Sequence, residues 1–390
     1  MKAYVYADAD GTAQVYYDRK RVWWGLSVFY PLLPIMGIAA HALSGSELGL
    51  LLPIVLSYGL GPAVDALLGE DLSNPPEEAV PALERDPYYR VLTYLTVPLH
   101  FVSLIAAAAW AGTHDLSLWA WLILAVTAGL SSGLGINTAH ELGHKQSKLE
   151  RVLARFALAV PAYGHFCVEH NLGHHRDVAT PEDPASARLG ESIYRFALRE
   201  IPGAIRRGWI TERERLQKKG LPVFSPHNEI LQSYAVSAVL QGGLILAFGL
   251  AMVPFLMIHN VVAWWQLTSA NYIEHYGLKR MRDAGGRYER CQPHHSWNSN
   301  HTFTNLLLFH LERHSDHHAH AGRRYQSLRN FDDVPRLPNG YLGMYLVAYV
   351  PWLWYRVMDR RLLALPHIAG DLERVNIDPA RRAEMLRRYG

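Results

Sequence analysis

The chain has 390 residues, of which 49% are hydrophobic, and its formal net charge is +3. This small charge, with no block of like charges, argues against a nucleic-acid-binding protein. The two cysteines, Cys167 and Cys291, are too few for a disulfide framework or a four-cysteine metal centre. The 21 histidines are a clear excess, and a function has to account for them.

The apolar residues gather in stretches of about 20 residues, which as helices are long enough to cross the hydrocarbon core of a bilayer. In chain order these stretches are residues 24–45, 48–68, 91–111, 116–138, 230–250 and 254–273. A proline-rich polar loop separates the second from the third, and a polar segment, 139–228, separates the fourth from the fifth. We therefore predict an all-α integral membrane protein with six transmembrane helices.

The chain divides at the ends of these spans. We expect an N-terminal arm with the first four spans, a polar segment, the last two spans, and a polar C-terminal segment; these are residues 1–138, 139–229, 230–273 and 274–390. The tight connections near 45–47, 112–115 and 251–254 contain no lysine or arginine, whereas the polar segments contain many. The positive-inside rule then places both termini and the polar segments in the cytoplasm.

The apolar stretch 341–358 is ambiguous, because a seventh span would move the arginine-rich C-terminus to the other side of the membrane. It has tyrosine and tryptophan near both ends and Pro351 in its middle. We prefer an interfacial or protein-packed segment over a span.

Nine histidines in four places are the strongest functional signal. They occur in HELGH, EHNLGHH, NYIEHYGL and ERHSDHH, and are His140, His144, His170, His174, His175, His275, His314, His317 and His318. Helical spacing puts the first and last histidine of HELGH on one face, and predicts the same for His170 with His174 and for His314 with His317. One zinc ion takes four ligands, so nine imidazoles suit two metal ions of higher coordination number. Imidazole binds iron, copper, nickel and zinc alike, so these residues do not identify the metal.

Acidic and amide side chains beside these motifs are candidates to orient the imidazoles by hydrogen bonds. They are Glu141, Glu169, Glu274, Asp183, Asp316 and Asn305, and the imidazole of His310 is a further candidate. HELGH also fits the HExxH pattern of zinc peptidases, with Glu141 as general base, but this explains only two of the nine histidines. A metal or proton transporter would need the histidines inside the spans, and most lie beyond their ends.

The spacings HxxxH, HxxxHH and HxxHH resemble the membrane family of fatty-acyl desaturases and hydroxylases. The stretches HELGHK, EHNLGHHRDVATPEDPASAR, NYIEHYGLKR and LERHSDHHAHAGRRYQSLR are similar to the signatures of bacterial alkane 1-monooxygenases. This resemblance implies that the nine histidines bind two non-haem irons in the bacterial inner membrane. It also implies O2-dependent hydroxylation of the terminal carbon of medium- or long-chain n-alkanes, with electrons from rubredoxin and an NADH-linked rubredoxin reductase. A fatty-acyl desaturase and a xylene-type hydrocarbon hydroxylase are the related alternatives.

An alkane dissolves in lipid, so we expect an apolar channel between the spans. Candidate lining residues are Trp23, Trp24, Tyr58, Phe101, Trp264 and Trp265, for each of which ordinary helix packing or an aromatic belt at the membrane interface is the alternative. Gly59 and Gly61 are candidates for setting the channel length. Arg19, Arg21 and the arginines between Arg381 and Arg388 are expected either to dock an acidic redox partner or to bind anionic membrane lipid.

Overall fold

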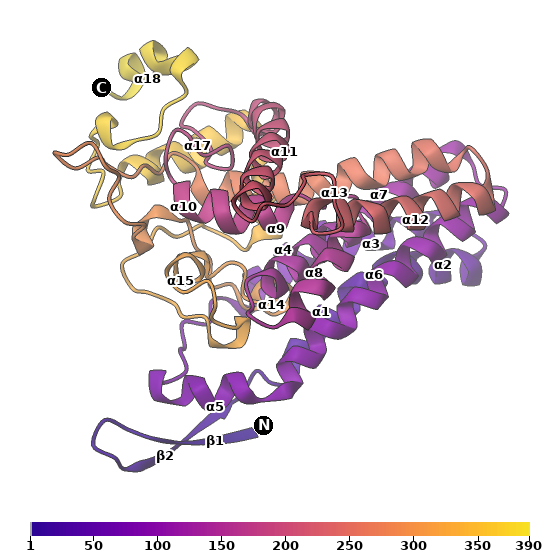
Figure 1. Cartoon of the computed structure of the whole chain (residues 1–390), viewed down its shortest axis with the longest axis horizontal. Coiled ribbons are helices and arrows are strands. Elements are labelled where there is room, and N and C mark those ends of the chain that lie inside the picture. The colour runs from indigo at the N-terminus through magenta and orange to yellow at the C-terminus, as the bar shows by residue number, and fades with distance from the viewer. Residues whose placement is uncertain (1) are drawn as a thin grey trace.

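The computed structural model describes residues 2–390 and is almost entirely helical in this part. The exception is an antiparallel hairpin of β1 (Lys2–Ala7) and β2 (Ala13–Asp18). Long helices lie side by side at one end of the molecule, and the long helix α11 (Ile193–Lys218), short helices and loops form the other end, with the hairpin at its edge (Figure 1).

Five helical stretches are long and apolar enough to cross a membrane. They are Trp23–Ser44, Glu47–Leu68, α6 (Pro87–Thr113), α7 (Leu118–Gly143) and α12 (Glu229–Phe248). They match the first five predicted spans. The sixth predicted span coincides with α13 (Met252–His275), which has the length but carries several polar residues, such as His259 and Gln266, and so falls below the apolar composition of the others.

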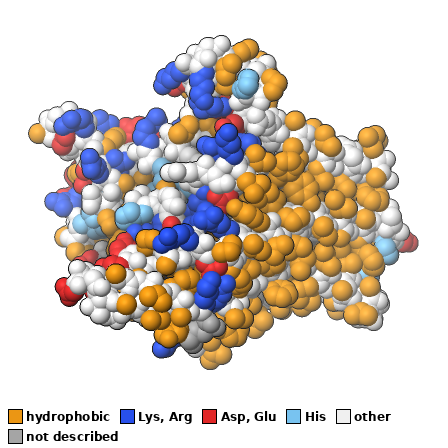
Figure 2. Space-filling view, turned by 60° about the horizontal axis from the view of Figure 1, so that its bottom comes forward, with side chains coloured by type: hydrophobic (Ala, Val, Ile, Leu, Met, Phe, Trp, Pro, Cys, Tyr) orange, Lys and Arg blue, Asp and Glu red, His pale blue; other side chains and the backbone are white. Residues whose placement is uncertain are grey.

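The first two stretches are not continuous α-helices. The first contains α1 (Leu26–Phe29) and α2 (Leu33–Ser44), and the second contains α3 (Leu52–Ile54), a π-helical turn and α4 (Gly61–Leu68). Figure 2 shows hydrophobic side chains covering the end of the molecule that holds the long helices, whereas charged side chains gather at the other end. This division is that of a membrane protein with a large polar portion outside the lipid.

The helices α7 and α13 form the centre of the bundle because glycines let their backbones approach closely. A Cβ atom at Gly129 would lie 2.6 Å from the carbonyl oxygen of His259, and one at Gly133 would lie 2.6 Å from the Gln266 side chain. Small residues at helix crossings are typical of packing in membranes. This contact holds the ends of α7 and α13, which carry the first histidine motif and His275, at the same end of the bundle.

The other helices cover that end of the bundle. They are α5 (Val80–Arg85), α8 (Lys148–Ala159), α9 (Phe166–Glu169), α10 (His175–Asp177), α11 (Ile193–Lys218), α14 (Thr302–Leu307), α15 (His314–Ala319), α16 (Tyr341–Ala348), α17 (Pro351–Leu363) and α18 (Arg382–Tyr389). The predicted boundary between residues 138 and 139 lies inside α7, which continues to Gly143.

The ambiguous stretch 341–358 is a packed segment, as preferred from the sequence. It forms two helices, α16 and α17, because Pro351 begins a new helix. Tyr341, Met344, Trp354 and Met358 are buried in the largest hydrophobic cluster. Helix α16 packs against α13, the helix that ends at His275.

Candidate metal centre

The fold brings all nine predicted histidines together, in two adjacent groups. The five-histidine group contains His140, His144, His170, His175 and His317, and the four-histidine group contains His174, His275, His314 and His318. Within each group, one ring nitrogen from every residue lies within 4.8 Å of those of the others. The two groups touch, because the rings of His175 and His318 have their centroids 4.5 Å apart.

The first motif behaves as its helical spacing predicts. His140 and His144 lie one turn apart at the end of α7, and both belong to the five-histidine group. His275 is the last residue of α13 and reaches the four-histidine group from the neighbouring helix. The close packing of α7 on α13 thus places one helix end beside each group.

The second motif differs from the α-helical expectation. Residues His170–His174 form a π-helical turn, in which hydrogen bonds join residue i to residue i+5. His170 and His175, five residues apart, therefore share the five-histidine group, whereas His174 belongs to the other group. The rings of His170 and His174 do stack, with centroids 5.1 Å apart, but the wider turn makes His175 and not His174 the partner of His170 in its group.

The third motif also serves both groups. His314 and His318 lie one α-helical turn apart on α15 and belong to the four-histidine group, while His317 points to the five-histidine group. The rings of His314 and His317 stack, with centroids 5.6 Å apart, although the two residues belong to different groups. The short helix α15 lies between the two groups and supplies imidazoles to both.

The geometry of the ring nitrogens fits a metal ion in each group. The Nε2 atom of His317 lies 2.9 Å from that of His140 and 3.0 Å from that of His175. In the four-histidine group, the Nε2 atom of His314 lies 3.2 Å from that of His275 and 3.0 Å from that of His318. With metal–nitrogen bonds of about 2.1 Å, two ligands at a right angle lie about 3.0 Å apart.

Two further observations favour metal binding. The Nε2 atoms of His144 and His174 are buried and have no hydrogen-bond partner, which is costly unless a cation takes their lone pairs. Burial also lowers the pKa of His175 to about 3 and holds the pKa of His170 and His318 well below the usual value. These imidazoles are therefore neutral at physiological pH, the form that binds a metal.

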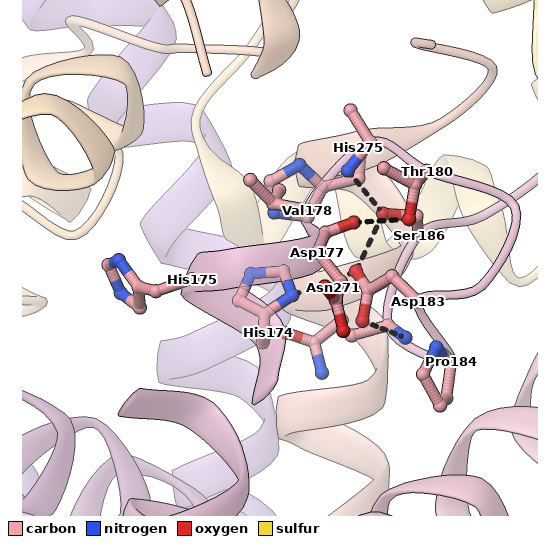
Figure 3. A network of polar contacts seen from close by, with 12 residues as sticks. His174, His175, Asp177, Val178, Thr180, Asp183, Pro184, Ser186, Asn271 and His275 are labelled. Atoms are coloured by element: carbon pink, nitrogen blue, oxygen red, sulfur yellow. Dashed lines mark hydrogen bonds and ion pairs between the residues drawn. The ribbon is translucent and has the colours of Figure 1, made fainter. Parts of the chain in front are cut away.

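Two of the predicted orienting residues contact the nine histidines. His174 donates from Nδ1 to Asp183 Oδ2 over 2.9 Å, and the Ser186 hydroxyl donates to the same carboxylate over 2.7 Å. Figure 3 shows Asp183 facing His174 from its loop, with His175 turned away to the other side. A Glu274 carboxylate oxygen lies 3.4 Å from Nε2 of His314. Both carboxylates thus contact the four-histidine group.

Glu141 does not have the position of a peptidase base. Its carboxylate lies 3.1 Å from Nζ of Lys145 and accepts a hydrogen bond from the backbone N–H of Tyr325. It forms no hydrogen bond to any of the nine imidazoles in the described part of the chain. The prediction that it orients a ligand was wrong, since a lysine one turn away binds it instead.

The remaining four predicted orienting residues are also bonded elsewhere. Glu169 binds Arg207, Asp316 binds His320 and Arg323, Asn305 donates to the carbonyls of Ser299 and His301, and His310 pairs with the carbonyl of Tyr325. Among residues 2–390 none of the four contacts a ring nitrogen of the nine histidines, so these predictions were wrong. These side chains support the backbone of the motifs.

The sequence analysis missed two residues that act on the motifs. Arg207 of α11 binds Glu169 and Asp183, and the carbonyl oxygen of His295 lies 3.4 Å from Nδ1 of His275. Neither has a helical spacing to its partner, and no signal in the sequence pointed to them.

An apolar cavity ends at the two groups. It is narrow, with a cavity volume of about 50 Å³. Its polar lining includes His140, His170, His314 and Glu274. The rest consists of Tyr30, Leu130, Gly133, Leu134, Asn137, Phe166, Gln266, Leu267, Ala270, Asn271, Leu308, Leu311, Leu342 and Tyr345.

None of the predicted channel residues lines this cavity. The hydroxyl of Tyr58 donates to Gln266, a lining residue, over 2.6 Å, and Trp265 packs on Tyr349. Trp23 is exposed, Trp24 packs on His310 and Tyr325, Trp264 donates to the carbonyl of Pro161, and Phe101 lies near Phe156. Gly59 and Gly61 are outside the lining as well. Trp24, Trp264 and Trp265 are therefore packing residues, whereas Trp23 lies on the surface.

A second, open pocket leads from the surface to the five-histidine group. It reaches His144, and four of its lining residues are basic: Arg85, Arg90, Lys145 and Arg324. Two glutamates, Glu84 and Glu150, also line it, and Arg324 binds Glu150. The metal centre therefore faces an apolar cavity on one side and a charged surface pocket on another.

Known proteins are similar to this chain over most of its length. The model of the fatty acid desaturase family matches residues 116–349. Alkane 1-monooxygenase 1 of Alcanivorax borkumensis is 52% identical over 98% of this chain and 94% of its own length. An alkane 1-monooxygenase of Pseudomonas putida is 50% identical over 97% of this chain and 94% of its own length. The hydroxylase component of a xylene/toluene monooxygenase from Pseudomonas putida is 27% identical over 76% of this chain and 78% of its own length. These matches confirm the resemblance seen in the histidine motifs: the chain belongs to the fatty acid desaturase family and, within it, to the alkane 1-monooxygenases.

Proposed function

We propose that the protein hydroxylates the terminal carbon of medium- or long-chain n-alkanes, using O2 and two irons held by the nine histidines. The observation that carries this proposal is the apolar cavity that ends at both histidine groups. A peptidase or transporter has no need of such a cavity beside two metal sites. Relatives named alkane 1-monooxygenase, about half identical over nearly the whole chain, support the same substrate class.

The protein's own residues would position the alkane. An unactivated C–H bond offers no group for acid–base attack, so the irons, when bound, would supply the oxidising chemistry. Leucines such as Leu134 and Leu308 line the cavity and exclude water. His140, His170 and His314 line its polar end, so a chain that enters end-on would present its terminal carbon to both groups.

The decisive experiment combines metal analysis with product identification. Purified protein should contain close to two irons per chain, and octane with O2, NADH, rubredoxin and its reductase should yield 1-octanol. One zinc without iron would overturn the proposal. A double bond introduced into a fatty-acyl substrate would favour a desaturase, and faster turnover of xylene than of octane would favour the xylene-type hydroxylase.

We also infer that six helices span the bacterial inner membrane, α13 being the sixth, with the nine histidines and both termini on the cytoplasmic side. On this view residues 1–138 and 230–273 contain the membrane part, and 139–229 and 274–390 form the cytoplasmic part. The distribution of lysine and arginine among the connections supports this orientation. The alkane would then reach the cavity from the lipid.

We infer that the electron donor, an acidic redox protein such as rubredoxin, docks over the surface pocket at His144. Here the five-histidine group comes closest to a basic, water-exposed surface. Lys145 and Arg324 are paired with Glu141 and Glu150, but Arg85 and Arg90 form no ion pair within residues 2–390. By contrast, Arg21 and Arg381 of the other predicted surfaces are bound to Asp86 and Glu384.

Reversing the charge of Arg85, an exposed residue of this pocket, should weaken donor docking. We expect Arg85→Glu to raise the KM for reduced rubredoxin about three- to tenfold at low salt, with unchanged iron content, and the effect should shrink as salt screens the charges. Steady-state kinetics at several ionic strengths measure this. Arg19→Glu is the matched control; if it gives the larger effect, the donor docks near the N-terminal hairpin instead.

A further inference from the structure

A cluster of buried charges surrounds the second histidine motif, and Arg207 is its centre. Arg207 donates from Nε to Glu169 over 2.7 Å and from Nη2 to Asp183 over 2.7 Å, and its Nη1 lies 3.5 Å from Asp177. The side chains of Glu169 and Asp183 are 4% and 0% exposed. One guanidinium thus neutralises carboxylates that water does not reach.

The three carboxylates flank the motif on both sides. Glu169 directly precedes His170, and Asp177 and Asp183 follow His175. Asp183 also accepts the Nδ1–H of His174, so a continuous chain of contacts joins Arg207 to the four-histidine group. Figure 3 shows Asp177, at the end of α10, and Asp183, in the loop that follows, near His174.

Arg207 also covers the π-helical turn itself. A Cβ atom at Gly173, between His170 and His174, would lie 2.7 Å from Nε of Arg207. One at Gly208 would lie 3.2 Å from Glu169 and 3.3 Å from His165, so α11 packs directly on the helix that precedes the turn. The absence of side chains at these two glycines lets the guanidinium lie on the backbone of the turn.

We propose that Arg207 is a positioning residue that holds the second motif in its π-helical form, and so divides its histidines between the two metal groups. The inference rests on the proposed two-iron site. In an α-helical turn His170 and His174 would share a face, and one of the groups would lose a member. Arg207 prevents this by fixing Glu169 before the turn and Asp183 after it.

The chemistry of this task suits arginine and not lysine. The guanidinium is a rigid planar fork that binds two carboxylates at once, while a lysine ammonium is a single point charge. Loss of Arg207 leaves two buried carboxylates without their cation and frees the turn to relax. His174 should then move, because it is the member of this motif that Asp183 holds.

The test compares Arg207→Gln, Arg207→Lys and the control Arg206→Gln as full-length proteins purified from membranes. Arg206 is exposed, is next to Arg207 on α11, and forms no ion pair within residues 2–390. Iron per chain and the Mössbauer spectrum of 57Fe-labelled protein are measured. We expect the control to keep two irons, Arg207→Gln to hold about one, and Arg207→Lys to lie between them with an altered spectrum.

Two irons with a wild-type spectrum in Arg207→Gln would overturn the inference, even if the melting temperature fell, because the ion pairs would then only stabilise the fold. If Arg207→Gln does not accumulate in the membrane, Arg207→Lys is used in its place, and two irons with a wild-type spectrum in that variant would overturn the inference. Two irons in the wild-type protein but no change in either variant would refute the positioning role alone. Fewer than two irons in the wild type would instead refute the proposed function.

Discussion

His275→Ala should abolish alkane hydroxylation while the protein remains inserted in the membrane. His275 is fully buried at the end of α13, and its Nε2 atom lies 3.2 Å from that of His314. Removing it leaves three imidazoles in the four-histidine group. Loss of a residue that merely orients a ligand costs about 10–100-fold, so we expect loss of the ligand itself to cost more than about 100-fold in turnover.

Octane turnover and iron per chain, measured on membranes with equal protein content, check this expectation. His227→Ala is the matched control, because His227 is exposed and lies outside both groups. Wild-type activity in His275→Ala would remove this residue from the metal site.

Ala270→Leu should shorten the cavity and reduce turnover of long n-alkanes about tenfold or more, with less effect on shorter ones. Ala270 is 3% exposed and lines the cavity from α13, four residues before Glu274. The larger side chain occupies space that the distal part of a long substrate needs. A methylene group that no longer fits costs about 10–200-fold in specificity.

Turnover of a series of n-alkanes, at equal iron content, gives the measurement. Val261→Leu is the control, because Val261 lies on the same helix but is 57% exposed on its outer surface. An equal loss for all chain lengths would mean that the substitution damages the site and not the cavity length. No loss at any length would place the substrate elsewhere.

The nine histidines could be recognised from the sequence because local spacing determines local geometry. His140 and His144 share a helix face wherever an α-helix forms, and the two structured groups contain no histidine that the motifs did not include. The division of the second motif was not predictable in this way, since an i, i+4 pattern is read as α-helical and the observed turn is π-helical. Arg207, more than 20 residues away along the chain, acts on that turn.

The residues that line the apolar cavity were also not predictable from the sequence. Aromatic residues such as Trp264 and Trp265 lie in predicted spans and looked suitable, but the cavity is lined mainly by leucines and polar residues of α7, α13, α16 and the 308–314 segment. Which face of a wholly apolar helix turns to the interior depends on its neighbours. Hydropathy does not distinguish these faces when lipid and protein interior are equally apolar.

The sequence by itself determined that the protein is helical and that most of its apolar stretches can cross a membrane, because both follow from composition and short-range spacing. Its resemblance to the alkane 1-monooxygenases identified the nine histidines as the candidate metal ligands. Only the tertiary structure decided how the histidines divide into groups of five and four, which carboxylates touch them, and where the apolar cavity meets them. The physical reason is that these properties depend on contacts between segments far apart in the chain, such as α7 with α13 and α11 with the second histidine motif.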